Sequence, residues 1–495
     1  MVNYFRKALV GATLIFVMNA LANLLAFTTK IILARNLSIT EYGLFYAVFN
    51  LVMFLLFFRD LGLGTALVKY IAEFKVSNKL HLITTITFVT LFFQLISSII
   101  FSFFLYFFAG FLATSYFKEA MAESLIKLFI MYIILSVFFK MTKYILRGFQ
   151  NFRVFSLFEF LKNGIILITL VIFFMFGHKT VLATAWAYVV GSLILFCILL
   201  PFAIRTFPFF QYPLISFKKT TKKMFLFGLP VLFTGIGGKV IGYLDTLILT
   251  YFGTLEQVGV YNAILPSAML FLFVGTSLSA VVFPMTSELF AKKDFKRLTA
   301  GINLLHKYTF LFMSTMILAL FSFAKLFITL SFGLKFNVGT VSFQILLVGV
   351  LFYIIAGINN NMISGIGKPK VVTITIVIAA LINVTLNVIL IPIYGIIGAA
   401  IATSVSYFIV FIISTIFLNR ILGMKSRIME WIKLSLLAIM FLFFINFLKD
   451  VLTFGLWANV ILSITMAGTL YLLLAWLFKV WSLKELKYYF KLFRK

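Results

Sequence analysis

The sequence contains few acidic residues, histidines and cysteines. Among 495 residues there are 13 Asp and Glu, three His and one Cys. Cys197 cannot form an intramolecular disulfide, and its apolar surroundings are typical of a small packed residue. His81, His178 and His306 lack the spacing of metal ligands, so we predict no metal site. We also find no carboxylate pair suited to hydrolysis, and we predict no cofactor and no enzymatic activity.

Charge is sparse overall, and this sets the class of protein. Charged residues make up 11% of the chain and hydrophobic residues 63%, with a mean hydropathy of +1.15. A soluble chain of this length needs far more polar surface, so the composition predicts a polytopic membrane protein. The net charge of +29 does not indicate nucleic-acid binding, because the basic residues lie between apolar segments. No GxxxxGK[ST] motif is present to indicate a nucleotide site.

Long apolar runs recur along the whole chain. Each is close to the roughly 20 residues that a helix needs to cross a bilayer. We predict an all-α fold with 14 transmembrane helices, at residues 8–28, 42–67, 82–108, 124–145, 156–176, 180–204, 223–250, 258–284, 304–330, 339–363, 371–392, 395–418, 430–448 and 456–478.

Lysine and arginine are distributed unevenly between the two sides that these helices define. With the N-terminus placed in the cytoplasm, 32 of the 42 basic residues lie on the inner side and 8 on the outer side. The remaining two, Arg59 and Lys239, lie in mid-membrane. This bias predicts a multi-pass protein of the cell membrane with both termini in the cytoplasm.

The chain also contains an internal repeat. ILARNLSITEYGLFYAVF (32–49) resembles ILTYFGTLEQVGVYNAIL (248–265), and RGFQNFRV (147–154) resembles SGIGKPKV (364–371). The offsets are 259 − 43 = 216 and 365 − 148 = 217. An even number of helices per repeat predicts two six-helix lobes, 1–217 and 218–425, related by an axis along the membrane normal. Residues 426–495 then form two extra helices and a basic cytoplasmic tail that we expect to lie on the inner leaflet.

Four charged residues interrupt the apolar segments. Arg59 and Asp60 are neighbours in the second segment, so their side chains diverge by about 100° on a helix. Lys239 and Asp245 lie in the seventh, FGLPVLFTGIGGKVIGYLDTLILTY (227–251), which also contains five glycines and a proline. Intramembrane charges usually face a polar cavity, so Arg59 and Lys239 are candidate binding residues for an anionic group. Alternatively, Asp60 with Lys239 and Arg59 with Asp245 form salt bridges between helices, in a coupling or structural role.

Polar residues of two other segments are further candidates. Asn19 and Asn23 share one face of the first helix, and Lys30 lies at its expected outer end. Each could contact substrate, although intramembrane Asn more often bonds a neighbouring helix and a terminal Lys often extends to the interface. Glu159 and Lys162 are expected to form an i,i+3 surface pair.

These motifs together resemble the polysaccharide-transporter branch of the multidrug/oligosaccharidyl-lipid/polysaccharide flippase superfamily. The resemblance spans the chain. The residues on which it rests are ILARNLSITEYGLF (32–45), FRDLGLGTALVKYIAEF (58–74), RGFQNFRVFS (147–156), GLPVLFTGIGGKVIGYLDTLILTYFGTLEQVGVYNA (228–263) and ISGIGKPKVVT (363–373). The resemblance implies two six-helix lobes around a V-shaped cavity, with two further helices at the C-terminus. It also implies that cationic residues of central helices, here Arg59, Lys239 and Lys30 by position, hold a diphosphate.

The resemblance implies a function as well. It is translocation of a polyprenyl-diphosphate-linked oligosaccharide from the inner to the outer leaflet by alternating access. The expected partners are this lipid-linked substrate and membrane lipids, with the protein a monomer and the coupling ion not identified. A multidrug or organic-cation exporter of the same superfamily is the main alternative. A membrane-embedded glycan polymerase or ligase is a third hypothesis, disfavoured by the short outer loops.

Overall fold

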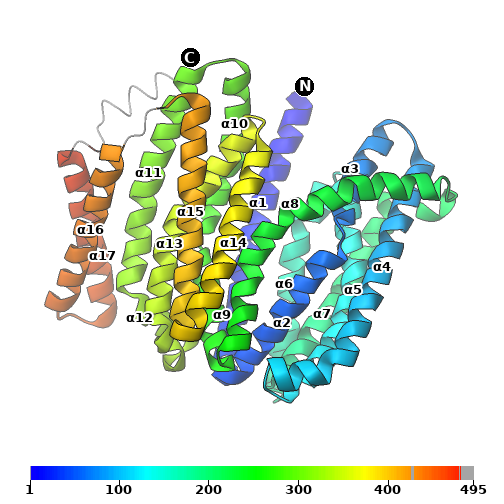
Figure 1. Ribbon diagram of the computed structural model, residues 1–495, viewed down its shortest axis with the longest axis horizontal. Helices are drawn as coiled ribbons and strands as arrows, with labels where there is room; N and C mark the ends of the chain where they lie inside the picture. Colours follow the sequence, from blue (N-terminus) through cyan, green and yellow to red (C-terminus); the bar gives the residue numbers. More distant parts are fainter. Residues whose placement is uncertain (1, 425–427, 479, 481–495) are drawn as a thin grey trace. The chain divides into compact units, whose positions relative to one another are not determined.

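The computed structural model describes residues 2–424, 428–478 and 480, and helices dominate this part of the chain (Figure 1). Fourteen of its helical segments are long and apolar enough to cross a membrane, and no strand occurs among the described residues. The predicted all-α polytopic fold is therefore confirmed. Most of the basic tail predicted after residue 478 lies outside the described residues.

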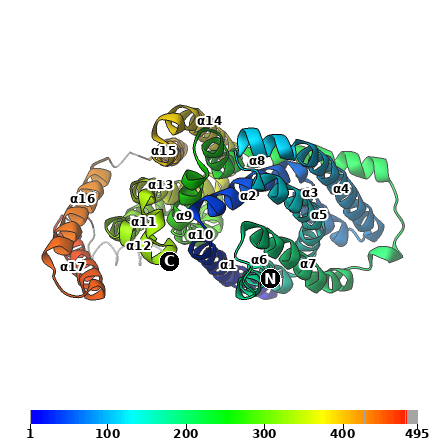
Figure 2. The ribbon, with the colours of Figure 1, turned by 90° about the horizontal axis from the view of Figure 1, so that it is seen from below.

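The chain divides into two compact units, Met1–Ala263 and Ile264–Lys495. In the first unit, α5 packs against both α4 and α7, and α1 packs against α6 (Figure 2). The helices of this unit are α1 (Val2–Asn36), α2 (Ile39–Arg59), α3 (Leu63–Val76), α4 (Leu80–Phe111), α5 (Met121–Gly148), α6 (Phe152–Met175), α7 (Val181–Thr206), α8 (Phe217–Phe252) and the first turns of α9 (Leu255–Met269).

In the second unit, α13 packs against α11, α14 and α15, so it lies at the centre of the helix group. The last two helices, α16 and α17, pack against this group through α11. Trp431 of α16 lies 5.5 Å from the ring of Phe310, and the Tyr471 hydroxyl of α17 lies 3.0 Å from that of Ser314. The helices of this unit are the end of α9, α10 (Leu272–Ala291), α11 (Phe295–Ser322), α12 (Ala324–Phe332), α13 (Thr340–Gly365), α14 (Pro369–Tyr394), α15 (Ile396–Leu422), α16 (Ile428–Val451) and α17 (Leu456–Leu477).

The second, eighth and ninth predicted spans are not continuous helices, and the ninth, 304–330, is divided at Phe323 into α11 and α12. The run at 42–67 ends as α2 at Arg59, turns through Leu61 and Gly62 at φ values of 51° and 70°, and restarts as α3. The run at 258–284 is likewise divided into α9 and α10. Hydropathy alone missed these breaks, because apolar residues continue on both sides of each one. Both repeats thus contain an interrupted helix, but the breaks at Leu61 and Leu270 are 270 − 61 = 209 residues apart and do not follow the repeat offset of 216.

Helix ends recur at the offset of the sequence repeat. α1 and α8 end at Asn36 and Phe252 (252 − 36 = 216), and α2 and α9 begin at Ile39 and Leu255 (255 − 39 = 216). The start of α2 is fixed by a capping box, in which Ser38 and Glu41 each accept a hydrogen bond from the other's backbone N–H.

Equivalent residues of the repeat meet each other within the first unit. The Oγ1 atom of Thr40 lies 3.5 Å from Oε1 of Glu256, and these positions are 216 residues apart. A Cβ atom added at Gly43 would overlap the backbone at Leu255, and one added at Gly259 would overlap the carbonyl of Ile39. Contacts between equivalent residues are what a two-fold relation produces, although the symmetry of the whole lobes stays a prediction.

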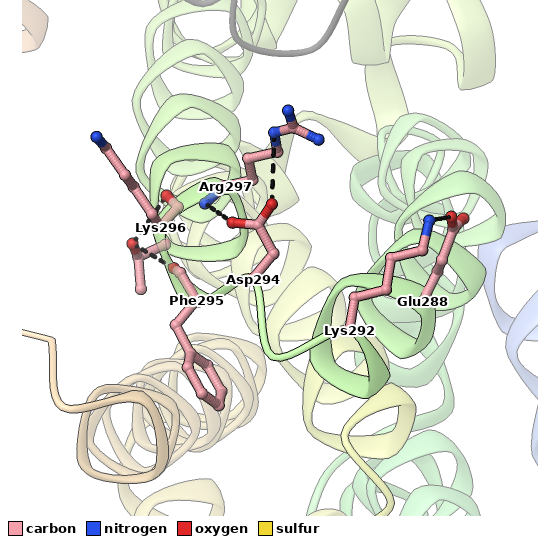
Figure 3. A network of polar contacts seen from close by, with 7 residues as sticks. Glu288, Lys292, Asp294, Phe295, Lys296 and Arg297 are labelled. Atoms are coloured by element: carbon pink, nitrogen blue, oxygen red, sulfur yellow. Dashed lines mark hydrogen bonds and ion pairs between the residues drawn. The ribbon is translucent and has the colours of Figure 1, made fainter. Parts of the chain in front are cut away.

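At the turn between α10 and α11, two basic residues are paired with carboxylates (Figure 3). Lys292 pairs with Glu288, and Nε of Arg297 lies 3.4 Å from Asp294, which also caps α11 by accepting the N–H of Arg297. The cap satisfies one of the backbone donors that are unpaired at a helix start. Acidic residues are therefore interleaved with basic ones at this turn.

Candidate functional site

The candidate site begins where α2 breaks, at Arg59 and Asp60. Asp60 accepts hydrogen bonds from Nε2 of Gln94 on α4 at 2.7 Å and from the hydroxyl of Tyr144 on α5 at 3.0 Å. These neutral donors satisfy the carboxylate inside the first unit. The predicted pair between Asp60 and Lys239 does not form, because α4 and α5 supply the partners of Asp60 instead.

Arg59 is completely buried at the end of α2. Its Nη1 lies 3.4 Å from Oγ of Ser98, while Nε and Nη2 have no hydrogen-bond acceptor among the described residues. A buried guanidinium is costly unless its donors are satisfied. Asp60 is the adjacent carboxylate and provides the nearest compensating charge along the chain.

Helix α8 lies directly against this break. A Cβ atom at Gly62 would overlap the backbone carbonyl of Gly228 in α8, and one at Gly228 would lie only 3.0 Å from the carbonyl of Leu61. Only glycine allows this approach, and Gly62 also adopts a left-handed φ of 70°. The break that positions Arg59 is thus packed against the helix that contains Lys239.

One face of α8 is open and lined by glycine. Gly235, Gly238, Lys239 and Gly242 follow the i, i+3, i+4, i+7 spacing of a single helix face. A Cβ atom at Gly235 would lie 3.3 Å from the ring of Phe57, whereas one at Gly238 or Gly242 would meet no atom within 4 Å, so the face is open from Gly238 to Gly242. The side chain of Lys239 is exposed. The ammonium of Lys239 lies 5.5 Å from the ring centre of Tyr243, and no carboxylate pairs with it in the described part of the chain. α8 thus combines an unpaired cation with exposed backbone.

The other charged candidates lie in the interior of the first unit. Asp245 is 1% exposed and accepts a hydrogen bond of 2.8 Å from the hydroxyl of Tyr261. Lys30 donates to the backbone carbonyl of Asn262 at 3.2 Å and lies 3.8 Å above the ring of Tyr46. These contacts hold α1 against α2 and α9, and they hold α8 against α9.

Asn19 and Asn23 differ from these interior residues. Both side chains are exposed on α1, four residues apart. The structure therefore separates the candidates into an exposed group, Lys239 with Asn19 and Asn23, and a group with polar partners inside the first unit, which comprises buried Arg59 and Asp245 and half-buried Asp60 and Lys30. Sequence alone did not make this distinction, because hydropathy does not show which side of a helix is covered.

Sequence reasoning missed a charged cluster on α5 and α6. Nζ of Lys143 lies 2.5 Å from Glu159, and Lys162 lies 3.6 Å from the other oxygen of the same carboxylate. The predicted pair of Glu159 and Lys162 therefore forms, and Lys143 of α5 joins it as a third charge. Gln94 and Tyr144 were also missed, although a glutamine within an apolar run was a visible signal.

Comparisons with known proteins agree with this architecture. The family model "Polysaccharide biosynthesis protein" matches residues 8–290. An uncharacterized membrane protein of Methanocaldococcus jannaschii is 29% identical over 95% of this chain and 94% of its own. A probable low-salt glycan biosynthesis flippase of Haloferax volcanii is 22% identical over 42% of this chain and 44% of its own.

A solved structure shares the fold over nearly its whole length. A lipid II flippase in an inward closed conformation superposes with a TM-score of 0.75 at 18% identity, covering 94% of this chain and 98% of the flippase. At this identity the likeness shows the fold alone. The family match covers more than half of the chain and confirms the resemblance noted in the sequence. The chain belongs to the polysaccharide biosynthesis protein family.

Proposed function

We propose that this protein flips a polyprenyl-diphosphate-linked oligosaccharide from the inner to the outer leaflet by alternating access. The observation that carries the proposal is Lys239, an exposed cation without a carboxylate partner on the glycine face of α8. A charge at the bilayer centre costs about 3 kcal/mol on insertion scales, so such a residue usually faces a polar path. The family membership and the flippase named among the relatives support the same reading.

The chemistry of this face suits a bulky anionic headgroup. A lysine ammonium binds phosphate as a point charge, and it tolerates movement of the bound group better than a rigid bidentate clamp. Gly238 and Gly242 leave open space beside Lys239, so a diphosphate could approach the helix backbone. Exposed Asn19 and Asn23 on α1 offer amide groups that could hydrogen-bond sugar hydroxyls.

Export of organic cations, the main alternative, needs a different charge pattern. A site for a cation should present carboxylates that are free to bind it. Asp60 and Asp245 instead accept hydrogen bonds from Gln94, Tyr144 and Tyr261. The exposed charge in the spanning part of α8 is Lys239, which repels a cation. These observations favour an anionic substrate.

A reconstituted flipping assay tests the proposal. The purified full-length protein is placed in liposomes with a fluorescent polyprenyl-diphosphate sugar, and an outer-leaflet quencher reports translocation. We expect faster loss of protected fluorescence than in protein-free liposomes, and competition by unlabelled lipid-linked sugar. Absence of flipping in every ion gradient, with uptake of an organic cation instead, would overturn the proposal in favour of the exporter.

A further inference from the structure

Helix α8 is longer than a membrane span requires. Its 36 residues measure about 54 Å at 1.5 Å per residue, whereas the hydrocarbon core is about 30 Å thick. The excess lies at the start, where residues 217–223 (FKKTTKK) include four lysines and no acidic residue. Figure 1 shows the first part of α8 turned away from the steep course of the rest of the helix. Pro230 inside the helix provides a place for the bend.

This first part of α8 is packed against α3 and α4 of the first unit. Met224 is fully buried in a core cluster with Leu67 and Tyr70 of α3 and Ile86 of α4. The preceding loop is fixed by Thr85, whose hydroxyl exchanges hydrogen bonds with the backbone O and N of Ile215 at 3.1 and 3.2 Å. The segment is therefore an ordered element with one buried face.

The remaining surface of the segment combines apolar and basic side chains. Phe217 and Leu226 are 38% and 68% exposed. Lys218, Lys219 and Lys222 are exposed as well, whereas Lys223 is paired with Glu73 at 2.7 Å. Within the described residues, none of the three exposed lysines pairs with an acidic group. Exposed apolar residues beside unpaired lysines are typical of an element lying in a membrane interface.

We propose that Lys218, Lys219 and Lys222 form a binding site for the headgroups of anionic membrane lipids. The apolar neighbours lie toward the acyl chains, and the three ammonium groups meet phosphate at the headgroup level. Each lysine near an anionic surface contributes enough binding energy to change affinity several-fold, so three together give a marked preference over zwitterionic lipid. The site is distinct from the open face around Lys239 and does not depend on the proposed substrate.

Because the three lysines lie at the start of α8, lipid bound to them should also affect the rest of this helix. The segment continues into Gly228, which packs on the break at Gly62, and then into the face with Lys239. A bound anionic lipid stabilises the first part of α8 against α3 and α4. We therefore expect anionic lipid to stabilise the folded protein as a whole.

The test uses the purified full-length protein in mild detergent with added phosphatidylglycerol or phosphatidylcholine of identical chains. Native mass spectrometry counts bound lipid, and thermal unfolding measures stabilisation. The variant is Lys218→Gln/Lys219→Gln/Lys222→Gln. The matched control, Lys118→Gln/Lys179→Gln/Lys335→Gln, removes three exposed lysines from the ends expected to be outside.

We expect phosphatidylglycerol to bind wild type and control alike, and to bind the first variant at least tenfold more weakly. Its melting temperature should also gain less from phosphatidylglycerol. Equal phosphatidylglycerol binding by the two triple variants would overturn the proposal, as would equal stabilisation of wild type by the two lipids. Neither readout requires flipping, so failure here is distinguishable from failure of the proposed function.

Discussion

At the scale of single residues, substitutions of Lys239 distinguish a substrate-binding role from a structural role. Its side chain is exposed and has no carboxylate partner in the part of the chain that the structure describes, so its loss leaves no buried charge behind. A lost charged contact to phosphate is worth about 1.5–3 kcal/mol. We expect Lys239→Gln to flip the lipid-linked sugar tenfold or more slowly, with an unchanged melting temperature, and Lys239→Arg to retain most activity. Normal flipping by the Gln variant in liposomes would contradict a substrate role.

Tyr144, unlike Lys239, is expected to have a structural role. Its hydroxyl is one of two neutral donors to Asp60, at 3.0 Å. Removing a hydrogen bond to a carboxylate destabilises a fold by about 2 kcal/mol. We expect Tyr144→Phe to lower the melting temperature measurably. Tyr70→Phe is the matched control, because its hydroxyl makes a weaker contact of 3.4 Å with a backbone carbonyl. Equal melting temperatures of the two variants would show that the Asp60 network does not stabilise the α2 break.

At the scale of helices, the open face of α8 makes a distinct prediction. Leucine at Gly242 meets no atom at its Cβ, and glycine within a helix is less stable than other residues by about 0.5–1 kcal/mol. We therefore expect Gly242→Leu to fold as well as wild type and yet to flip poorly, because the side chain fills the space beside Lys239. Gly468→Leu in α17 is the control, since its Cβ position is also open. Similar flipping by the two variants would show that this face of α8 is not the path.

The same helices show what the sequence could predict and what it could not. Hydropathy predicted the 14 spans because apolar length is a local property of the chain. The breaks at Leu61, Leu270 and Phe323 were missed, and the first of them depends on neighbouring backbone, with Gly228 against Gly62. Asp60 was predicted to pair with Lys239, but its partners Gln94 and Tyr144 come from helices whose rotation hydropathy does not specify. The intramembrane charges could be identified from the sequence, but which of them are exposed depends on how the helices pack.

At the scale of the whole molecule, the proposed alternating access would require parts of the two repeats to separate and meet again. The structure shows a meeting point at the start of α2 and α9, where Thr40 and Glu256 touch at 3.5 Å and Gly43 lies against Leu255 and Gly259. These residues lie at the end of the helices that we expect to face outward. If the substrate leaves on this side, we expect the contact to open in every transport cycle.

Cross-linking this contact tests that expectation. Cysteines replace Thr40 and Glu256 in a Cys197→Ser background, which removes the native thiol, and a short cleavable bifunctional thiol reagent joins them. We expect the cross-linked protein to lose flipping and to regain it when the linker is cleaved, because the covalent bridge prevents α2 and α9 from separating. Each single-cysteine variant treated with the same reagent controls for modification alone. Flipping at the wild-type rate by fully cross-linked protein would show that transport does not open this contact, and would place the exit path elsewhere.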